Sequence, residues 1–172
     1  AAFGLADYCR IGGDVHLTWE HRFLSFLSFR ERVSTLASLR STLGRWQLNG
    51  RAFHNDPDVF ILRSEKQQLT PAQQQTMLTI QALSGNLLFT SDDIGQYTPE
   101  QTSELQGALE LQGSNILSIT EPEKDFYRIE FENAGHAFIA LCNLGSRAFD
   151  LSAIAAKVEI ELQPFESIVL KT

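Results

Sequence analysis

The feature that most constrains this chain is a change of hydrophobic period just after Gly113. Before that residue, short continuous apolar runs alternate with stretches whose apolar residues recur at helical spacing. After it, apolar and polar residues alternate, so Tyr127, Ile129 and Phe131 are expected on one face of a strand. The first pattern is typical of strands buried on both faces with helices between them, and the second is typical of antiparallel strands. The chain of 172 residues is long enough to form one unit of each kind.

Three strand–helix pairs are predicted in the first part of the chain. The strands are expected over 3–10, 59–62 and 87–89, and the helices over about 20–43, 70–84 and 98–112. Two helices start with Thr-Pro, at Thr70 and Thr98, where threonine caps the first turn and proline fits its first position. This order of elements indicates a parallel sheet with helices outside it, either a doubly wound sheet or a barrel.

The composition of two polar stretches in this part predicts their local structure. The segment 46–58 is rich in turn residues and is predicted to be a loop. The glutamine-rich stretch 67–75 is predicted to be a solvated helix face.

The second part of the chain predicts several short strands. They are expected over 126–132, 137–142, 158–162 and 167–170, with a turn at 133–136. Such strands are typical of an antiparallel sandwich. The sequence therefore predicts an α/β domain over residues 1–114 and an all-β domain over residues 115–172.

Composition excludes some partners. Fourteen Lys and Arg residues stand against 21 Asp and Glu residues, a net charge of −7. Nucleic acids and anionic membrane surfaces both need a basic footprint, so neither is expected as a partner. No apolar run is long enough for a membrane-spanning helix. The first residues lack a signal-peptide pattern, and Cys9 and Cys142 form no CxxC pair, which leaves localisation undetermined with the cytoplasm favoured.

Charged and polar residues gather at the predicted carboxyl ends of the strands, where parallel βα folds place functional groups. Arg10 and Asp14 follow the first strand, and Gly12 and Gly13 between them would let the backbone turn sharply and leave space beside the carboxylate. The pair could hold the polar oxygens of a ligand, or it could be a salt bridge within the loop.

Two further polar segments lie near the other strand ends. Asn55-Asp56-Pro57-Asp58 is either part of a site or a helix-to-strand connection held by side-chain-to-backbone hydrogen bonds. Asp92 and Asp93 could ligate a metal, but a loop or cap role is favoured because two acids do not define a site. The cysteines and the four histidines are too scattered for zinc. We therefore expect no metal.

Taken in order, these segments resemble the melibiase-type α-galactosidases, glycoside hydrolases of family 36 in clan D. Arg10–Asp14 is similar to the family's Arg-x-x-x-Asp at the end of the sixth barrel strand, and Asn55–Asp58 to its Asn-Asp-Pro-Asp signature at the seventh. The later matches are Leu69–Pro71, Leu83–Gly85, Ser91–Asp93 and Pro164–Leu170, the last of them similar to the final strands of the family's C-terminal domain. The resemblance implies the last three βα units of a (β/α)8 TIM barrel over 1–114 and a C-terminal antiparallel β-sandwich over 115–172.

The resemblance also implies a chemistry. It is the retaining hydrolysis of terminal α-galactosides, without cofactor, by two carboxyl groups about 5–5.5 Å apart. Asp14 matches the general acid/base, and Arg10 matches a residue that contacts sugar hydroxyls. Asp58 matches an acidic residue that lines the pocket, and Val59 a position at the pocket edge. The implied ligands are α-galactoside sugars.

The sequence departs from the family in two places and lacks one essential group. His54 stands where the family usually has Trp, and the connection 47–53 looks longer than usual. The family's nucleophile is an Asp in a Lys-x-Asp pattern, and this chain, which begins at Ala1 without Met, has no Lys-x-Asp. We therefore expect a C-terminal fragment whose nucleophile lies upstream and which is inactive by itself.

Two expectations follow for the isolated chain. A slice of a barrel leaves sheet edges and an inner apolar face open, so self-association through those edges is expected. The alternative to an enzyme fragment is a non-catalytic carbohydrate-binding or interaction module, since strands beside short helices are compatible with that class as well.

Overall fold

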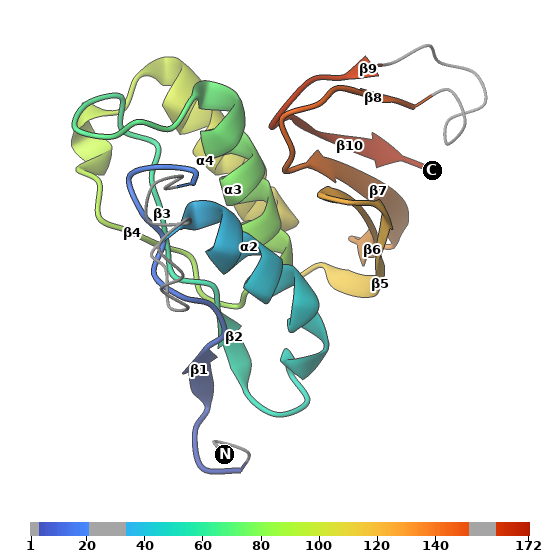
Figure 1. The fold of residues 1–172 in the computed structure, drawn as a ribbon. Coiled ribbons are helices and arrows are strands. Elements are labelled where there is room, and N and C mark those ends of the chain that lie inside the picture. The colour runs from blue at the N-terminus through green and yellow to red at the C-terminus, as the bar shows by residue number, and fades with distance from the viewer. Residues whose placement is uncertain (1–3, 21–33, 152–160) are drawn as a thin grey trace, which may run out of the picture. The chain divides into compact units, whose positions relative to one another are not determined.

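A computed structural model describes residues 4–20, 34–151 and 161–172 (Figure 1). The chain divides into two compact units, Ala1–Gly113 and Ser114–Thr172. Within the described ranges, no helix is both long and apolar enough to cross a membrane. The first unit holds helices and parallel strands, and the second holds antiparallel strands.

The parallel strands of the first unit are short and form two separate pairs. Strand β1 (Tyr8–Arg10) pairs with β2 (His54–Asp56), and β3 (Val59–Phe60) pairs with β4 (Phe89–Thr90). The segment 54–60 therefore pairs first with β1 and then with β4, and it is interrupted at Asp58, whose φ is 76°.

The predicted strands differ from the observed ones at this point. The predicted strand 59–62 is regular only in β3, and β2 lies in the segment predicted to be a loop. The turn residues in that segment indicated a loop. The strand forms because it pairs with β1, which is 46 residues away in the sequence.

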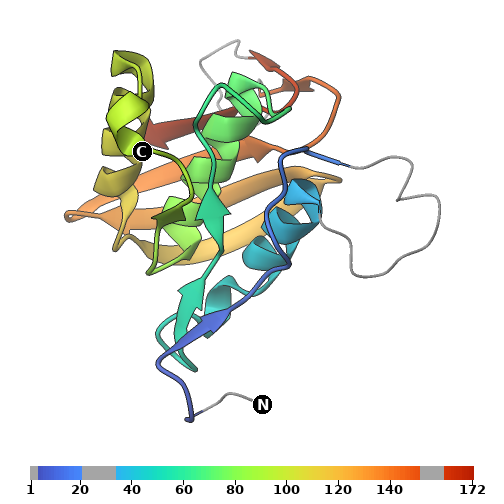
Figure 2. The ribbon, with the colours of Figure 1, turned by 90° about the vertical axis from the view of Figure 1, so that its left-hand side faces the viewer.

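Three described helices lie on one side of these strands, as Figure 2 shows. They are α2 (Thr35–Gly44), α3 (Pro71–Ser84) and α4 (Pro99–Leu111), with single 3-10 turns at η1 (Trp46–Leu48) and η2 (Ile94–Gln96). The predicted Thr caps are confirmed: Thr70 and Thr98 each form a capping box, with Gln73 and Gln101 respectively. The first half of the helix expected from residue 20 falls on 21–33, outside the described residues.

The strands bury one face and expose the other. Asn55 and Phe60 lie on the helix side and are buried, whereas Tyr8 and Phe89 on the opposite side are 52% and 49% exposed. The prediction that the strands 3–10 and 87–89 are buried on both faces is therefore wrong for the described residues. The described helices cover one face only, and the apolar runs by themselves do not show which face is covered.

The second unit contains a four-stranded antiparallel sheet in the order β10-β7-β6-β5. Its strands are β5 (Asn115–Glu123), β6 (Phe126–Asn133), β7 (His136–Asn143) and β10 (Ser167–Lys171). A separate antiparallel pair is formed by β8 (Phe149–Asp150) and β9 (Glu161–Leu162). The predicted antiparallel arrangement is confirmed. Sequence reading missed β5, because its bulges between Ile116 and Ser118 and between Thr120 and Glu123 break the alternation.

Both faces of this sheet carry buried side chains. Tyr127, Ile129 and Phe131 share one face, as predicted, and are at most 8% exposed. On the other face Phe126 and Leu141 form a core with Leu151 and Leu162, and the Phe126 ring stacks on Phe149 at 4.8 Å. The pair β8–β9 thus supplies a second layer over this face.

Candidate active site

The centre of the candidate site is Arg10 at the end of β1. Its guanidinium contacts three carboxylates: Nη1 lies 3.2 Å from Asp14 Oδ1, Nε lies 3.3 Å from Asp56 Oδ2, and Nη2 lies 2.8 Å from Asp58 Oδ1. The structure therefore brings together Arg10, Asp14 and Asp58, which the sequence singled out. It also brings in Asp56, a site residue that sequence reasoning did not assign.

The three carboxylates differ in their exposure and in the number of hydrogen bonds that they accept. The Asp14 side chain is 77% exposed and forms an ion pair with Arg10. The Asp58 side chain is 8% exposed, and its Oδ2 also accepts a hydrogen bond from Val15 N at 2.6 Å. Asp56 links the two ends of the cluster, because its Oδ1 accepts from Asp58 N at 2.9 Å. Asp14 is thus the carboxylate that is open to a ligand, and Asp56 and Asp58 fix the frame around Arg10.

The unusual backbone at Asp58 is maintained by this frame. A φ of 76° lies in the left-handed region, which costs free energy for a residue other than glycine. The bond from Asp58 N to Asp56 and the ion pair with Arg10 hold the residue there. The motif Asn55–Asp58 therefore acts as a connection held by side-chain hydrogen bonds and, at the same time, as part of the charged cluster.

Helix α2 holds the segment that carries Asp14. Hydroxyl groups at its start and along one face donate to backbone carbonyls of residues 11–19: Ser34 to Trp19, Thr35 to His16, Ser38 to Gly13 and Ser41 to Ile11. Sequence reading missed these groups because it followed only apolar spacing. The recurrence of serine at 34, 38 and 41, which is helical spacing, is the signal that could have found them.

The same helix explains one of the two glycines. A Cβ at Gly12 would lie 2.8 Å from Ser38 Oγ, whereas a Cβ at Gly13 would meet nothing within 4 Å. Neither glycine has a positive φ. The chain bends at Gly12, as expected, and the bend needs no left-handed backbone at either glycine. Gly12 is needed because α2 passes close to it.

His54 and Val59 lie on the exposed side of the strands. The His54 ring lies 5.2 Å from the Tyr8 ring between centroids, and its Nδ1 lies 2.6 Å from Asn86 Nδ2. Val59 is half-buried and pairs in register with Phe89. The face that continues from Arg10 and Asp56 is therefore lined by aromatic rings as well as charges.

Two glutamines of α3 hold the backbone of the segment that bears Asp58. Gln81 Nε2 donates to Pro57 O and Val59 O at 3.3 and 3.1 Å, and Gln74 Nε2 donates to Ile61 O and Arg63 O at 3.1 and 3.0 Å. Both side chains are buried. The prediction of a solvated face over 67–75 is wrong for Gln73 and Gln74, and right for Gln68 and Gln75, which are exposed.

Asp92 forms a second polar cluster at the end of β4. Its Oδ2 accepts from Leu62 N, Arg63 N and Tyr97 Oη at 2.6, 2.9 and 2.8 Å, and its Oδ1 lies 2.6 Å from Arg63 Nη1. Burial alone would raise the pKa of Asp92, but these hydrogen bonds together outweigh it and lower the pKa. Burial, with the Asp92 charge adding to it, raises the pKa of Tyr97 to about 12.

The acids at this strand end have the structural role that the sequence favoured. Asp93 caps η2 by accepting from Gly95 N, while Asp92 joins the ends of β3 and β4. Among the described residues no group of three or more His, Cys, Asp or Glu side chains is placed to hold a metal ion.

Comparison with solved structures relates this fold to glycoside hydrolases, and specifically to α-galactosidases. The chain is similar to TtGalA, the α-galactosidase from Thermus thermophilus in complex with p-nitrophenyl α-D-galactopyranoside. The two are 27% identical with a TM-score of 0.58, over 74% of this chain and 26% of that one. No protein-family model matches the chain.

A second similar structure is the α-galactosidase from Saccharomyces cerevisiae with raffinose. The TM-score is 0.56 at 15% identity, over 91% of this chain and 41% of that one. This likeness shows the fold alone. The chain spans about a quarter of the length of the Thermus enzyme and about two fifths of the yeast enzyme.

Proposed function

We propose that this chain is the C-terminal part of a retaining α-galactosidase. Residues 1–114 would form the last three βα units of its barrel, and residues 115–172 its C-terminal sandwich. The observation that carries the proposal is the Arg10 cluster, in which one guanidinium joins carboxylates near the ends of β1 and β2. The similarity to the Thermus enzyme, at 27% identity, supports the substrate class.

Each residue of the cluster has a role in this proposal. Asp14 donates a proton to the departing glycosidic oxygen and then removes one from the attacking water. Its exposure lets its carboxyl group reach a ligand. A guanidinium has five N–H donors, and Arg10 uses three of them on Asp14, Asp56 and Asp58, which leaves two for sugar hydroxyls. Asp58 and Val59 border the pocket.

The nucleophile of this reaction lies outside the 172 residues. A retaining mechanism needs a second carboxylate to form the glycosyl intermediate, and no Lys-x-Asp occurs in the chain. The isolated chain should therefore hydrolyse no p-nitrophenyl α-galactoside. Measurable hydrolysis by the isolated chain that disappears in Asp14→Ala would contradict this assignment.

The acid/base role is tested in the longer protein that contains this chain. Asp14→Ala should lower kcat/KM for raffinose by about 10²–10⁴-fold. The p-nitrophenyl substrate should be less affected in its first step, because its leaving group departs without much protonation. Azide needs no general base, so it should restore turnover of that substrate and yield a galactosyl azide of retained configuration.

The matched control is Asp7→Ala. Asp7 is an exposed carboxylate just before β1, outside the Arg10 cluster. The control should keep normal activity, and azide should not change its products. Normal raffinose hydrolysis by Asp14→Ala would exclude Asp14 as the acid/base. Absence of all glycosidase activity in the longer protein, with sugar binding retained, would favour the alternative of a carbohydrate-binding or interaction module.

A further inference from the structure

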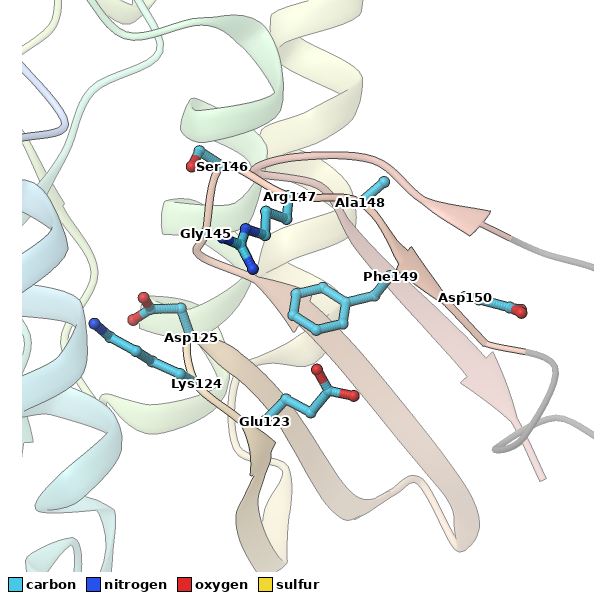
Figure 3. A pocket seen from close by; sticks show the side chains of 9 residues that line it. All are labelled: Glu123, Lys124, Asp125, Gly145, Ser146, Arg147, Ala148, Phe149 and Asp150. Carbon is cyan, nitrogen blue, oxygen red and sulfur yellow. The ribbon is translucent and has the colours of Figure 1, made fainter.

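The second unit contains a polar hollow that lies apart from the Arg10 cluster in the sequence and has no role in the proposed reaction. Its volume is about 590 Å³, within the range of small-molecule sites. The β5–β6 turn, the loop after β7 and strand β8 form its walls (Figure 3). The charged and aromatic residues that line it are Glu123, Lys124, Asp125, Arg147, Phe149 and Asp150.

Hydrogen bonds within the chain fix the walls of the hollow. Asn143 is fully buried, and its Nδ2 donates to Arg147 O at 2.7 Å and to Gln163 O at 2.9 Å. Its Oδ1 accepts from Gly145 N at 2.9 Å. Leu144 N donates to Asp125 O at 2.7 Å, which ties the loop after β7 to the β5–β6 turn. The loop that carries Arg147 is therefore preorganised, which reduces the entropy cost of binding.

The charges in the hollow favour a neutral ligand. Three carboxylates and two cationic groups line it, so neither an anion nor a cation meets a field of one sign. No described group of acids there is placed to hold a metal ion. Carboxylates accept hydrogen bonds, whereas Lys124 and Arg147 donate them. A ligand with many hydroxyl groups, each both donor and acceptor, can use all of these partners.

The aromatic ring of Phe149 adds an apolar surface to this polar set. In Figure 3 the ring projects between the Glu123 carboxylate and the Arg147 guanidinium. Phe126 stacks on it at 4.8 Å and fixes its orientation. A fixed ring flanked by hydrogen-bonding groups suits a pyranose, whose C–H face is apolar and whose rim carries hydroxyls.

We propose that this hollow is a second, non-catalytic saccharide site that holds an oligosaccharide of two or three sugar units. The saccharide class follows from the chemistry of the hollow, while the choice of a galactose-containing probe rests on the proposed function. Arg147 and Lys124 donate to sugar hydroxyls, Glu123 accepts from them, and Phe149 contacts the sugar face.

Titration of the 172-residue chain with raffinose, followed by the backbone amide NMR signals, tests the site. The signals of Gly145, Ser146 and Phe149 should shift and saturate.

Arg147→Ala should weaken binding about tenfold, as loss of a hydrogen bond from a charged group predicts. Glu123→Gln, which keeps the shape of the side chain, should weaken it by less. Phe149→Leu removes the ring but keeps apolar packing on Phe126, so lost binding with an unchanged spectrum elsewhere would assign the ring to the site.

Two control variants separate this site from the rest of the chain. Arg51→Ala removes an exposed arginine in the first unit, and Asp14→Ala removes the proposed acid/base. Both should leave the raffinose-induced shifts of Gly145, Ser146 and Phe149 unchanged. In the longer protein, Arg147→Ala should leave hydrolysis of p-nitrophenyl α-galactoside unchanged, so failure of this proposal and failure of the proposed function are distinguishable.

Three outcomes would overturn the second site. One is the absence of any shift at Gly145–Phe149 up to the solubility limit of raffinose. Another is a set of shifts confined to residues around Arg10 and Asp58. The third is displacement of raffinose from these amides by a lower concentration of inorganic phosphate, which would make the hollow an anion site.

Discussion

The two units of this chain satisfy the backbone hydrogen bonds of their strands in different ways. The four-stranded sheet of the antiparallel unit has longer strands, with eight residues in β6 and eight in β7, joined by a tight turn. In that turn Ala134 and Gly135 have φ values of 49° and 78°, as a two-residue hairpin loop requires. The parallel unit has strands of two or three residues. There, side chains of α3 and of Asp92 form hydrogen bonds with backbone groups of residues 57–63.

The difference shows which parts of the fold are self-sufficient. In the four-stranded sheet of the antiparallel unit, backbone groups pair with one another across the strands, and apolar side chains are buried on both faces of the sheet. In the parallel unit, Gln74, Gln81 and Asp92 satisfy the segment 57–63, while Tyr8 and Phe89 stay half-exposed on the strand face. That face also bears the Arg10 cluster. Under the proposed function, this face would be covered by the rest of the barrel. That would explain why it bears both half-exposed aromatic rings and the Arg10 cluster.

The largest expected effect comes from the core of the antiparallel unit. Phe131 is 1% exposed, so Phe131→Ala should lower the free energy of unfolding of this unit by about 3–5 kcal/mol. The chain's two tryptophans, Trp19 and Trp46, both lie in the parallel unit. Urea unfolding should therefore show an earlier transition by far-UV circular dichroism than by tryptophan fluorescence.

The matched variant on the open strand face is Phe89→Ala. Because Phe89 is 49% exposed, this change should alter the fluorescence-detected stability by less than about 0.5 kcal/mol. We also propose that the isolated chain self-associates through this face, so sedimentation velocity should show weaker association for Phe89→Ala than for the parent chain. A well-behaved monomer at all concentrations, or a stability loss as large as that of Phe131→Ala, would show that the face is already covered.

The next effect tests whether side chains replace strand pairing in the parallel unit. Gln81→Ala leaves the carbonyls of Pro57 and Val59 without their glutamine donor, which should cost roughly 2–3 kcal/mol by tryptophan fluorescence. Gln75→Ala, on the exposed face of the same helix, is the control and should cost less than about 0.5 kcal/mol. Equal effects of the two variants would mean that the glutamine bonds add nothing to stability.

The sequence was sufficient to predict those features that depend only on neighbouring residues. The caps at Thr70 and Thr98 depend on residues three positions away, and the shared face of Tyr127, Ile129 and Phe131 depends only on alternation. Both were predictable. The burial of Gln74 and Gln81 was not, because their partners are carbonyls of residues 57–63 rather than anything on the helix itself.

The same limit applies to the candidate site. Arg10 and Asp14 were predictable as a pair, since they are four residues apart and follow one strand. Asp56 is 46 residues from Arg10, and its part in the cluster depends on the pairing of β1 with β2 inside a segment full of turn residues. Its role as a shared partner of Arg10 and Asp58 therefore needed the tertiary structure.

A smaller effect than that of Gln81→Ala is expected at Asp92, and it depends on pH. Its pKa is lowered in the folded chain, so its contribution to stability is present above its ordinary value of 3.8 and is lost as the pH falls through the lower folded value. Asp92→Asn should therefore cost about 1–2 kcal/mol at pH 7, and the difference from the parent chain should shrink as the pH falls below 3.8. Urea unfolding followed by tryptophan fluorescence at each pH measures it. Asp93→Asn, which alters an exposed cap, should show little change with pH, and a difference for Asp92→Asn that grows toward acid would contradict the linkage.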